Sequence, residues 1–542
     1  MIKSLSVDET DTNNIEADVI VLGRSLPGVV VAHRLRQKFG DTMDIKLLDL
    51  SGVVDNYSSR NVTFQVPLGE DDRQRESLDA ADVYIGNVAH RYIMHYMTEF
   101  NIPIPETLFR TEVSDPPQKM YQYRDGRVVT SPNDYHEFSF LNFFQRLELN
   151  NYQSSLDRRM SELFRGRRED DADSRTLRYY DRTSMESDLV SFLLLSESRD
   201  VMRLVVRTVC GASAHSVSLL FYLHQCYRNG GSRNYVGGAN TSLREKLLGY
   251  CRKRLTRKLQ QSVEDITFLV KPIKTIRTYS DEQVIVETTK GDYNYVCNQL
   301  AMAVRPEELS KISFEERLLS NLWEAVESAR GLRPRQTKKF QVKYAEKFWR
   351  QRGFSGEILS VRGPILWAIE KPVYSTTGSL EKYSTLVGFL EADDEDEANS
   401  REAVLAQLVE LFGAQAASPT EYRETEVEGF VPRCEDYVAL RSLARTSSAL
   451  VVWGALDLFA DGDLAAALEA GHSAYVRLVL SMRPQAQDFD DLSAMQWRRV
   501  LPDTSFVTWF NTLSYNDGFR YVMYCGALYL GYRVFRKYII RS

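Results

Sequence analysis

The chain has 542 residues, enough for roughly three or four domain equivalents of about 150 residues each. Apolar residues make up 43%, charged residues 26%, and the net charge is −6. This composition is ordinary for a globular protein and excludes a collagen, a coiled coil or a wholly disordered chain. No basic excess indicates nucleic-acid binding. The 6 cysteines are scattered without C-x-x-C spacing, so neither a metal site nor a disulfide scaffold is expected, and a reducing compartment is the simpler interpretation.

The N-terminal part of the chain predicts a short lead followed by a βαβ unit. Residues 1–16 are polar and acidic and lack the apolar run of a secretory signal, so we expect a disordered lead. The apolar, β-branched run Ala17–Gly23 predicts a buried parallel strand, and residues 29–39 have helical spacing. A second apolar run, Ile45–Leu50, predicts another buried strand, with Asp49 near its end.

The turn between the first strand and the helix has the spacing of a dinucleotide fingerprint. Gly23 and Gly28 stand at its two ends, and Ser25 occupies the place of the middle glycine. In such a turn a pyrophosphate meets the helix N-terminus, while an acid after the second strand, here Asp49, accepts the ribose hydroxyls. A doubly wound domain whose turn binds nothing is the open alternative. An NAD-dependent dehydrogenase would explain this unit but not the glycine segments that follow.

Segments further along the chain make the pattern more specific. Tyr84 and Gly86 precede a helical stretch, and residues 209–231 lead into the glycine pair of YVGGAN at 235–240. Closer to the C-terminus stand VWGALD and then DGDLAAALEAG. In these segments the chain resembles flavin-containing monoamine oxidases, and the resemblance extends from about residue 18 to the C-terminal tail.

The resemblance implies FAD as the cofactor. Arg60 would grip the diphosphate, although the paired glycines of the family segment are missing here, and the backbone of Ile273 would lie beside the adenine. Cys434 would be the thiol that bonds covalently to the flavin, with an ordinary buried cysteine as the alternative. The other positions assigned to FAD are Gly23, Ser25, Gly28, Asp49, Gly86, Gly237, Gly238, Gly454, Asp457 and Gly462.

One lysine is the candidate catalytic residue. In the family, a lysine ten residues before the tryptophan of an F-W pair hydrogen-bonds through a water to the flavin N5. Lys339 stands at that spacing before Trp349. The alternative is a surface lysine in a basic stretch, because Lys338 and Lys343 are close by in the sequence.

The expected substrate site departs from the family. The family holds the amine between two parallel tyrosines; here Glu435 and Asp463 stand at those positions, and Tyr84 is the third residue assigned to the substrate. Paired acids would hold a cationic amine by charge-assisted hydrogen bonds. The chain would then be an altered amine oxidase that turns an amine into an imine, then an aldehyde, and reduces O2 to H2O2. The alternative is an inactive relative that acts as a membrane-anchored binding or scaffold protein.

The expected fold class is α/β, with a Rossmann-like FAD-binding domain interleaved with an α+β substrate domain around a mixed sheet, plus a C-terminal helix. The FAD-binding domain is expected at 17–80, 210–295 and 430–485, and the substrate domain at 81–209 and 296–429. The expected partners are a small-molecule amine and O2, without nucleic acid. A homodimer is an open option.

The C-terminal segment, 486–542, holds one uncharged run, 521–532, with Arg520 and Arg533 beside it. A membrane span needs about 20 apolar residues, and flanking arginines that snorkel extend the candidate helix to about 519–535. A buried or interfacial helix would have the same run. The resemblance favours a tail anchor in the mitochondrial outer membrane with the body facing the cytosol; a cytoplasmic protein is the alternative.

Overall fold

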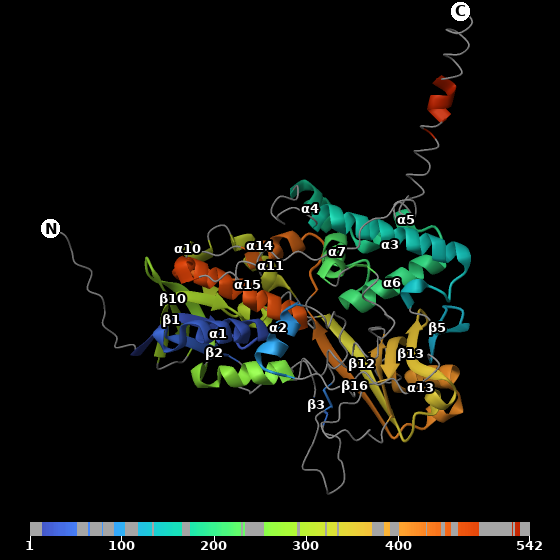
Figure 1. The fold of residues 1–542 in the computed structure, drawn as a ribbon, viewed down its shortest axis with the longest axis horizontal. Coiled ribbons are helices and arrows are strands. Elements are labelled where there is room, and N and C mark those ends of the chain that lie inside the picture. Colours follow the sequence, from blue (N-terminus) through green and yellow to red (C-terminus); the bar gives the residue numbers. More distant parts are fainter. Residues whose placement is uncertain are drawn as a thin grey trace, which may run out of the picture.

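The computed structural model has two large mixed β-sheets and a layer of helices (Figure 1). The residues that it describes are 13–50, 63–64, 78–79, 91–102, 117–132, 135–164, 174–228, 231–232, 254–270, 272–289, 293–319, 322–332, 335–370, 384–390, 400–429, 431–445, 450–456, 464–486, 523 and 526–531.

The first sheet contains the predicted βαβ unit. Its strands are β1 (Asn13–Leu22), β2 (Ile45–Asp49), β7 (Thr267–Leu269), β8 (Ile273–Ser280), β9 (Gln283–Thr288), β10 (Tyr293–Met302), β11 (Ser313–Phe314) and β17 (Val451–Val452). They stand in the order β11-β8-β9-β10-β1-β2-β7, and β17 pairs with β10. β1 runs parallel to β10 and to β2, while β9 is antiparallel to β8 and β10.

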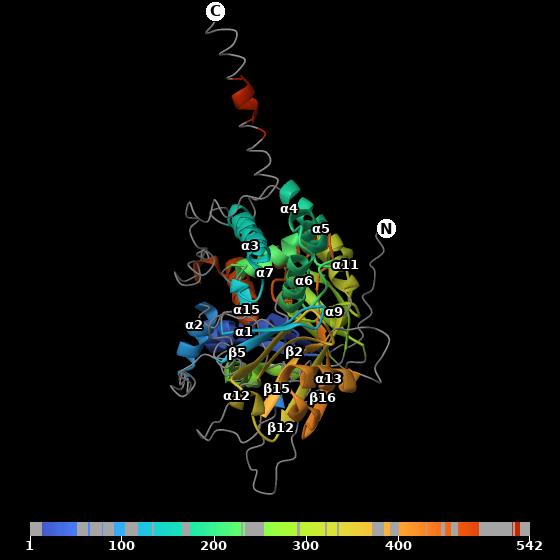
Figure 2. The same cartoon turned by 90° about the vertical axis from the view of Figure 1, so that its right-hand side faces the viewer.

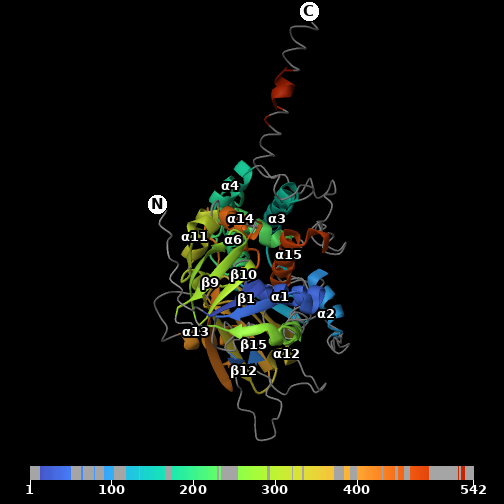
Figure 3. The same ribbon diagram turned by 90° about the vertical axis from the view of Figure 1, so that its left-hand side faces the viewer.

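Both faces of β1 are buried, as expected for a parallel strand inside an α/β sheet. Val19 and Val21 pack toward α1 (Leu26–Phe39) and α15 (Leu464–Met482), which lie side by side (Figure 3). Ile20 and Leu22 point to the opposite face, in a cluster with α11 (Trp323–Gly331) and α14 (Tyr437–Arg445). This alternation with a period of two places the carboxyl end of β1 between two helical layers.

The second sheet is the expected mixed sheet of the substrate domain. Its strands are β5 (Gln118–Gln122), β6 (Val128–Ser131), β12 (Arg335–Tyr344), β13 (Phe354–Ser360), β14 (Ile365–Glu370), β15 (Ser384–Leu390) and β16 (Glu421–Gly429), in the order β16-β12-β15-β14-β13-β5-β6. Phe340, Val342 and Tyr344 of β12 pack against α12 (Phe348–Gln351) and α13 (Ser400–Phe412). The other face is turned to a separate hydrophobic cluster.

That cluster joins the second sheet to a helical layer, which we define as α3 (Phe143–Phe164), α4 (Ser174–Arg182), α5 (Met185–Phe192), α6 (Ser196–Cys210) and α7 (Leu219–Arg228). Figure 2 shows these helices stacked above the sheets. Tyr121, Trp367 and Val387 from the sheet are buried together with Leu149 and Tyr222 from the layer. The helical layer therefore forms one packed body with the sheet face that it covers.

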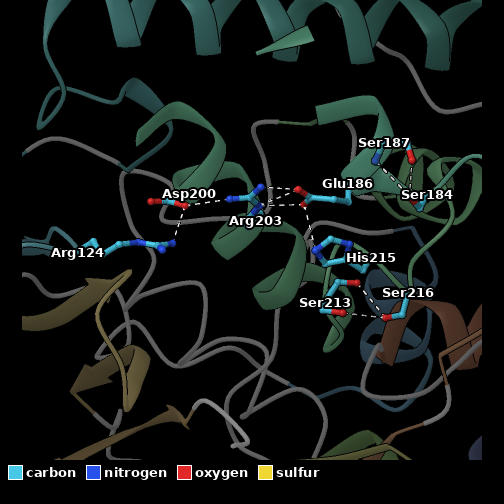
Figure 4. Close-up of polar contacts among 9 residues, drawn as sticks. All are labelled: Arg124, Ser184, Glu186, Ser187, Asp200, Arg203, Ser213, His215 and Ser216. Atoms are coloured by element: carbon cyan, nitrogen blue, oxygen red, sulfur yellow. Dashed lines mark hydrogen bonds and ion pairs between the residues drawn. The ribbon is translucent and has the colours of Figure 1, made fainter. Parts of the chain in front are cut away.

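Ion pairs reinforce the same junction at the surface (Figure 4). Arg124, in the turn between β5 and β6, lies 2.8 Å from Asp200 of α6, which also contacts Arg203 at 3.1 Å. The Arg203 Nε donates to Glu186 of α5 at 2.9 Å, and His215 lies 4.0 Å from the same carboxylate. The two carboxylates are largely buried and the two arginines are more exposed, so we interpret this network of charges as an architectural contact.

The remaining elements are short. β3 (Thr63–Phe64) and β4 (Leu78–Asp79) form a two-stranded sheet, and α2 (Arg91–Glu99) packs against α15. Two further helices are α9 (Pro306–Leu309) and α10 (Glu316–Leu319), and single 3-10 turns stand at Gly40–Thr42, Tyr135–Glu137, Glu264–Ile266, Ala414–Ala417 and Pro484–Ala486.

The predicted fold class is confirmed, and the structure adds detail to the expected boundaries. β1 begins at Asn13, inside the expected lead, because Asn13–Ala17 pair with Tyr293–Cys297 of β10. β10 continues to Met302, beyond the expected limit of 295, and α7 packs with α3 although 210–295 was expected in the other domain. The assignment of ranges to two domains stays a prediction.

The expected tail helix, 519–535, lies mainly outside the described residues. Met523 and Gly526–Gly531 are helical, and Leu528, Tyr529 and Leu530 are exposed; this red segment stands away from the body in all three ribbon views. None of the helices in the described ranges is both long and apolar enough to cross a bilayer.

Candidate functional site

The carboxyl ends of β1, β2, β10 and β17 meet at one edge of the first sheet, which we call the carboxyl edge. Gly23 follows β1, Asp49 ends β2, Ala303 follows β10, and Gly454 comes two residues after β17. In open α/β sheets ligands bind outside this edge. The structure therefore brings together four segments that are far apart in the sequence, three of which were predicted to contact FAD.

Both end glycines of the turn are required by close packing. Gly23 has a φ of +104°, and a Cβ there would lie 2.4 Å from the carbonyl oxygen of Ala303. A Cβ on Gly28 would lie 2.5 Å from the Cβ of Ala303. These are contacts that a larger residue cannot make, so the two glycines let the turn and α1 approach the end of β10.

The same tight packing holds α15 on α1. A Cβ on Gly471 would lie 2.6 Å from the carbonyl oxygen of Pro27 and 2.6 Å from the Cβ of Val30. Pro27 stands in the first turn of α1, where a missing N–H costs nothing. The sequence prediction thus identified the turn correctly as a strand-to-helix connection, and the helix begins at Leu26 rather than at residue 29.

Ser25 is the N-cap residue of α1, but its side chain makes no capping hydrogen bond. The residue is only 6% exposed, and its Oγ is buried without a hydrogen-bond partner among the residues that the structure describes. Buried hydroxyl groups are ordinarily hydrogen-bonded. The hydroxyl also stands at the positive end of a helix, where an anionic oxygen is stabilised. Ser25 therefore suits the diphosphate position predicted for it.

Asp49 lies where the ribose acid was predicted, at the end of β2 and only 4% exposed. The structure adds a neighbour that the sequence reasoning missed: the Arg24 Nη1 lies 3.3 Å from the Asp49 Oδ2. The Gly23 N–H donates to the Leu48 carbonyl at 2.9 Å and holds the turn beside β2. The only sequence signal for the ion pair was an arginine directly after the first fingerprint glycine.

Two further predicted cofactor residues lie in described segments of the first sheet. Ile273 opens β8, pairs with Thr288, and buries its side chain in the core below the sheet. Gly454 is buried between Trp453 and Ala455 at the end of β17. Their predicted contacts with FAD stay predictions.

Lys339 lies on β12 and is 4% exposed, so it is not a surface lysine. It pairs with Phe389 of β15 on one side and with Thr425 of β16 on the other. Its Nζ lies 5.9 Å from the centroid of the Phe389 ring, a distance typical of a cation–π contact. The Phe389 ring in turn stacks on Trp367 at 5.9 Å. The lysine thus stands on an aromatic surface that the spacing argument could not reveal.

The segment around Cys434 and Glu435 precedes α14. Cys434 is partly exposed, and Glu435 has a φ of +78°. The Glu435 side chain is 66% exposed and lies 3.7 Å from Arg182 of α4. A wall of an amine cage has to be buried, so the substrate role of Glu435 stays a prediction that this geometry does not favour.

A buried carboxylate fixes the same segment to α4. The Asp181 Oδ2 accepts a hydrogen bond from the Val438 N–H at 2.9 Å and so caps α14, while the Asp181 carbonyl accepts from the Glu435 N–H at 3.0 Å. Burial raises the pKa of Asp181 above its usual 3.8, although the bond from Val438 opposes the rise. The Glu435 backbone is therefore held outward, toward α4.

The other predicted site residues lie outside the described residues. They are Arg60, Tyr84, Gly86, Gly237, Gly238, Asp457, Gly462 and Asp463.

Comparisons with known proteins agree with this architecture. The profile of the family described as flavin-containing amine oxidoreductases matches residues 80–474. No curated protein sequence matches the chain. Among solved structures, wild-type putrescine oxidase bound to putrescine superimposes with a TM-score of 0.66 at 17% identity, covering 86% of this chain and 99% of that chain. Cyclohexylamine oxidase from Brevibacterium oxydans IH-35A gives 0.62 at 18% identity, covering 86% and 100%.

At these identities the structural matches show the fold, and the profile shows the family because it spans well over half of the chain. The resemblance seen in the sequence is thereby confirmed, and with it the expected cofactor, FAD. The chain belongs to the flavin-containing amine oxidoreductase family.

Proposed function

We propose that the chain is an FAD-dependent amine oxidase. The overall reaction removes two electrons and two protons from an amine to give an imine, which water hydrolyses to an aldehyde, and O2 is reduced to H2O2. The observation that carries the proposal is the carboxyl edge. Two close-packed glycines, the buried Asp49 and the Ser25 hydroxyl, which has no partner among the described residues, surround a helix N-terminus there.

These residues fit a dinucleotide. The turn from Gly23 to Gly28 and the positive end of α1 would take the diphosphate, with the Ser25 hydroxyl as a donor, and Asp49 would take the adenosine ribose. When bound, the flavin ring accepts the hydrogen from the α-carbon of the amine. The protein supplies binding, orientation and exclusion of water.

Lys339 is the residue to which we assign the catalytic role. A buried ammonium group held over an aromatic ring has a fixed position, and it can orient a water molecule by donating a hydrogen bond to it. This role predicts that removal of the charge slows turnover without releasing the cofactor.

We propose simple aliphatic amines as the first substrates to test, because the structural neighbours are named putrescine oxidase and cyclohexylamine oxidase. A cationic diamine would also suit a site with an acidic residue, as predicted for Asp463. The ratio of kcat/KM for putrescine to kcat/KM for cyclohexylamine therefore distinguishes a diamine site from a monoamine site.

The test is peroxide release by the purified full-length protein, compared with the Lys339→Met variant. Lys338→Met is the matched control, because Lys338 is the adjacent residue on β12, points to the other side of the strand and is partly exposed. We expect amine-dependent peroxide from the wild type and the control and a large loss in Lys339→Met. Equal rates of peroxide release in all three proteins would contradict a catalytic role for Lys339. If no amine leads to peroxide release by the wild type, the proposed oxidase activity is wrong.

A second candidate, a non-catalytic binding protein, is favoured by one observation: the exposed Glu435 beside Arg182 leaves one predicted cage wall at the surface. This candidate predicts a protein that binds FAD and amines but releases no peroxide.

We also propose that residues 519–535 anchor the protein in the mitochondrial outer membrane, from the uncharged run and its basic flank. The test is a fluorescent reporter fused to residues 486–542. A diffuse signal would contradict the anchor, and a mitochondrial ring would support it.

A further inference from the structure

The Arg24 guanidinium has a hydrogen-bond donor without an acceptor among the described residues. Its Nη1 lies 3.3 Å from the Asp49 Oδ2, and its side chain is only 18% exposed. The Nε–H is buried and has no hydrogen-bond partner within the described part of the chain. The adjacent Ser25 Oγ is likewise buried without a hydrogen-bond partner among the described residues. Two donors from neighbouring residues at one helix N-terminus therefore have no acceptor among the described residues.

The chemistry of the two donors defines that acceptor. A guanidinium is always charged and presents its N–H groups in a planar fork, which matches phosphate and carboxylate oxygens. Among the described residues, this guanidinium is paired through its Nη1 with Asp49, and its Nε–H has no partner. Burying an unpaired donor is unfavourable, and a charged donor next to a helix N-terminus attracts an anion. Phosphate oxygens are acceptors of the kind that both groups need.

The charge balance points the same way. Asp49 is a buried carboxylate close to the turn, and a diphosphate placed there would be repelled by it. The Arg24 charge offsets this repulsion. The compensation matters in this chain because the segment after Asp49 lacks the paired glycines that approach the diphosphate, as the sequence SGVVDNYSSR shows. The family profile begins at residue 80, so the turn itself lies outside the matched region.

We propose that Arg24 is a cofactor-binding residue that donates a charge-assisted hydrogen bond to the diphosphate of FAD, with Asp49 holding it in place and Ser25 as a second donor. This inference rests on the proposed function, because it requires FAD at the carboxyl edge. The proposed contact lies in the turn between Gly23 and Gly28. The dinucleotide fingerprint specifies no residue type at the position of Arg24.

The test measures ligand affinity and needs no turnover. Full-length wild type, Arg24→Gln and Arg24→Lys are freed of flavin and titrated with FAD, ADP and adenosine. Arg36→Gln is the matched control, because Arg36 lies on α1, the helix that follows Arg24, but pairs at the surface with Asp41 and Asp265. Thermal unfolding without ligand, measured for each variant, separates misfolding from lost binding.

We expect Arg24→Gln to weaken FAD and ADP binding by about tenfold or more, the size of a lost charge-assisted hydrogen bond. Adenosine binding should stay unchanged, and Arg24→Lys should fall in between because it keeps the charge without the fork. The salt dependence of FAD affinity should also become weaker in Arg24→Gln.

Three outcomes would overturn the inference, and they distinguish its failure from the failure of the proposed function. If the wild type binds FAD and Arg24→Gln binds it equally or more tightly, the guanidinium does not contact the diphosphate and the inference fails alone. If the folded wild type binds neither FAD nor ADP, the proposed function fails and the role of Arg24 fails with it. If Arg24→Gln loses affinity for adenosine as strongly as for ADP, the residue acts on the ribose side and the diphosphate contact is wrong.

Discussion

Gly28 of α1 lies so close to Ala303 at the end of β10 that a Cβ built on the glycine would be 2.5 Å from the alanine Cβ. This contact sets the distance between the helix N-terminus and the sheet. It also links residues that are far apart in the sequence, because β10 lies beside β1 in the first sheet.

The Gly28→Ala substitution should therefore destabilise the fold. Overpacking a tight contact costs about 1–3 kcal/mol, measured as the free energy of unfolding in urea. Gly331→Ala is the control, because the space around Gly331 at the end of α11 is empty within 4 Å and its φ is in the ordinary region. A change within about 0.5 kcal/mol is expected there. Equal effects at both positions would contradict the packing argument.

A second prediction concerns Lys339 and Phe389. The contact at 5.9 Å between the ammonium and the ring should couple the two residues by about 0.5–2 kcal/mol. A double-mutant cycle with Lys339→Met and Phe389→Leu measures this coupling in unfolding free energy, and Leu keeps most of the apolar volume. Additive effects would show that the ring serves only as packing for β15.

Glu370 should give the protein an acid-sensitive stability. Burial raises the pKa of Glu370, but the charges of Arg350 and Lys347, with hydrogen bonds from Lys347 and Trp349, outweigh it and hold the pKa below 4.5. A depressed pKa means that the unfolded chain binds the proton more tightly, so this contribution is present above about pH 4.5 and is lost as the pH falls through the folded-state pKa.

The measurement for Glu370 is unfolding free energy against pH for the wild type and Glu370→Gln. The wild type should be more stable than the variant at pH 7, by about 1–3 kcal/mol, because the partly exposed cations of Lys347 and Arg350 and the Trp349 N–H lose a charged acceptor. The difference should shrink toward pH 3. If the difference in unfolding free energy between the two proteins stays constant with pH, Glu370 does not stabilise the fold as an ionised carboxylate.

Asp181 should behave in the opposite way. Burial raises its pKa above 3.8, so the folded state holds the proton more tightly, and stability from this group falls as the pH rises from below 3.8 through the folded-state pKa. Asp181→Asn keeps an oxygen acceptor for the Val438 N–H. The stability of the Asn variant relative to the wild type should therefore increase between pH 3 and neutral pH. A relative stability that decreases over this range would mean that the carboxylate is held by a cation.

The sequence was most informative where local pattern decides the structure. The apolar runs predicted β1 and β2, and the glycine spacing predicted the turn, because strand burial and turn geometry are local properties. The ring below Lys339 and the partner of Asp49 could not be predicted. Phe389 is brought to Lys339 by strand pairing, and Arg24 reaches Asp49 only once β1 and β2 are aligned.

The position of Glu435 illustrates a different limit. Counting residues from a family motif predicts a cage wall at Glu435, whereas the structure gives this residue an exposed side chain 3.7 Å from Arg182. A motif spacing carries no information about which way a loop backbone faces, and here the Glu435 N–H donates to the backbone carbonyl of Asp181 on α4.

The central claim, that this chain oxidises amines with FAD, is tested most directly by the visible flavin absorbance of the purified full-length protein. Without oxygen, addition of putrescine or cyclohexylamine should bleach the absorbance, and readmitted air should restore it with release of peroxide. A yellow protein whose absorbance no amine changes would contradict the oxidase, and a protein that stays colourless after addition of FAD would contradict the bound cofactor as well.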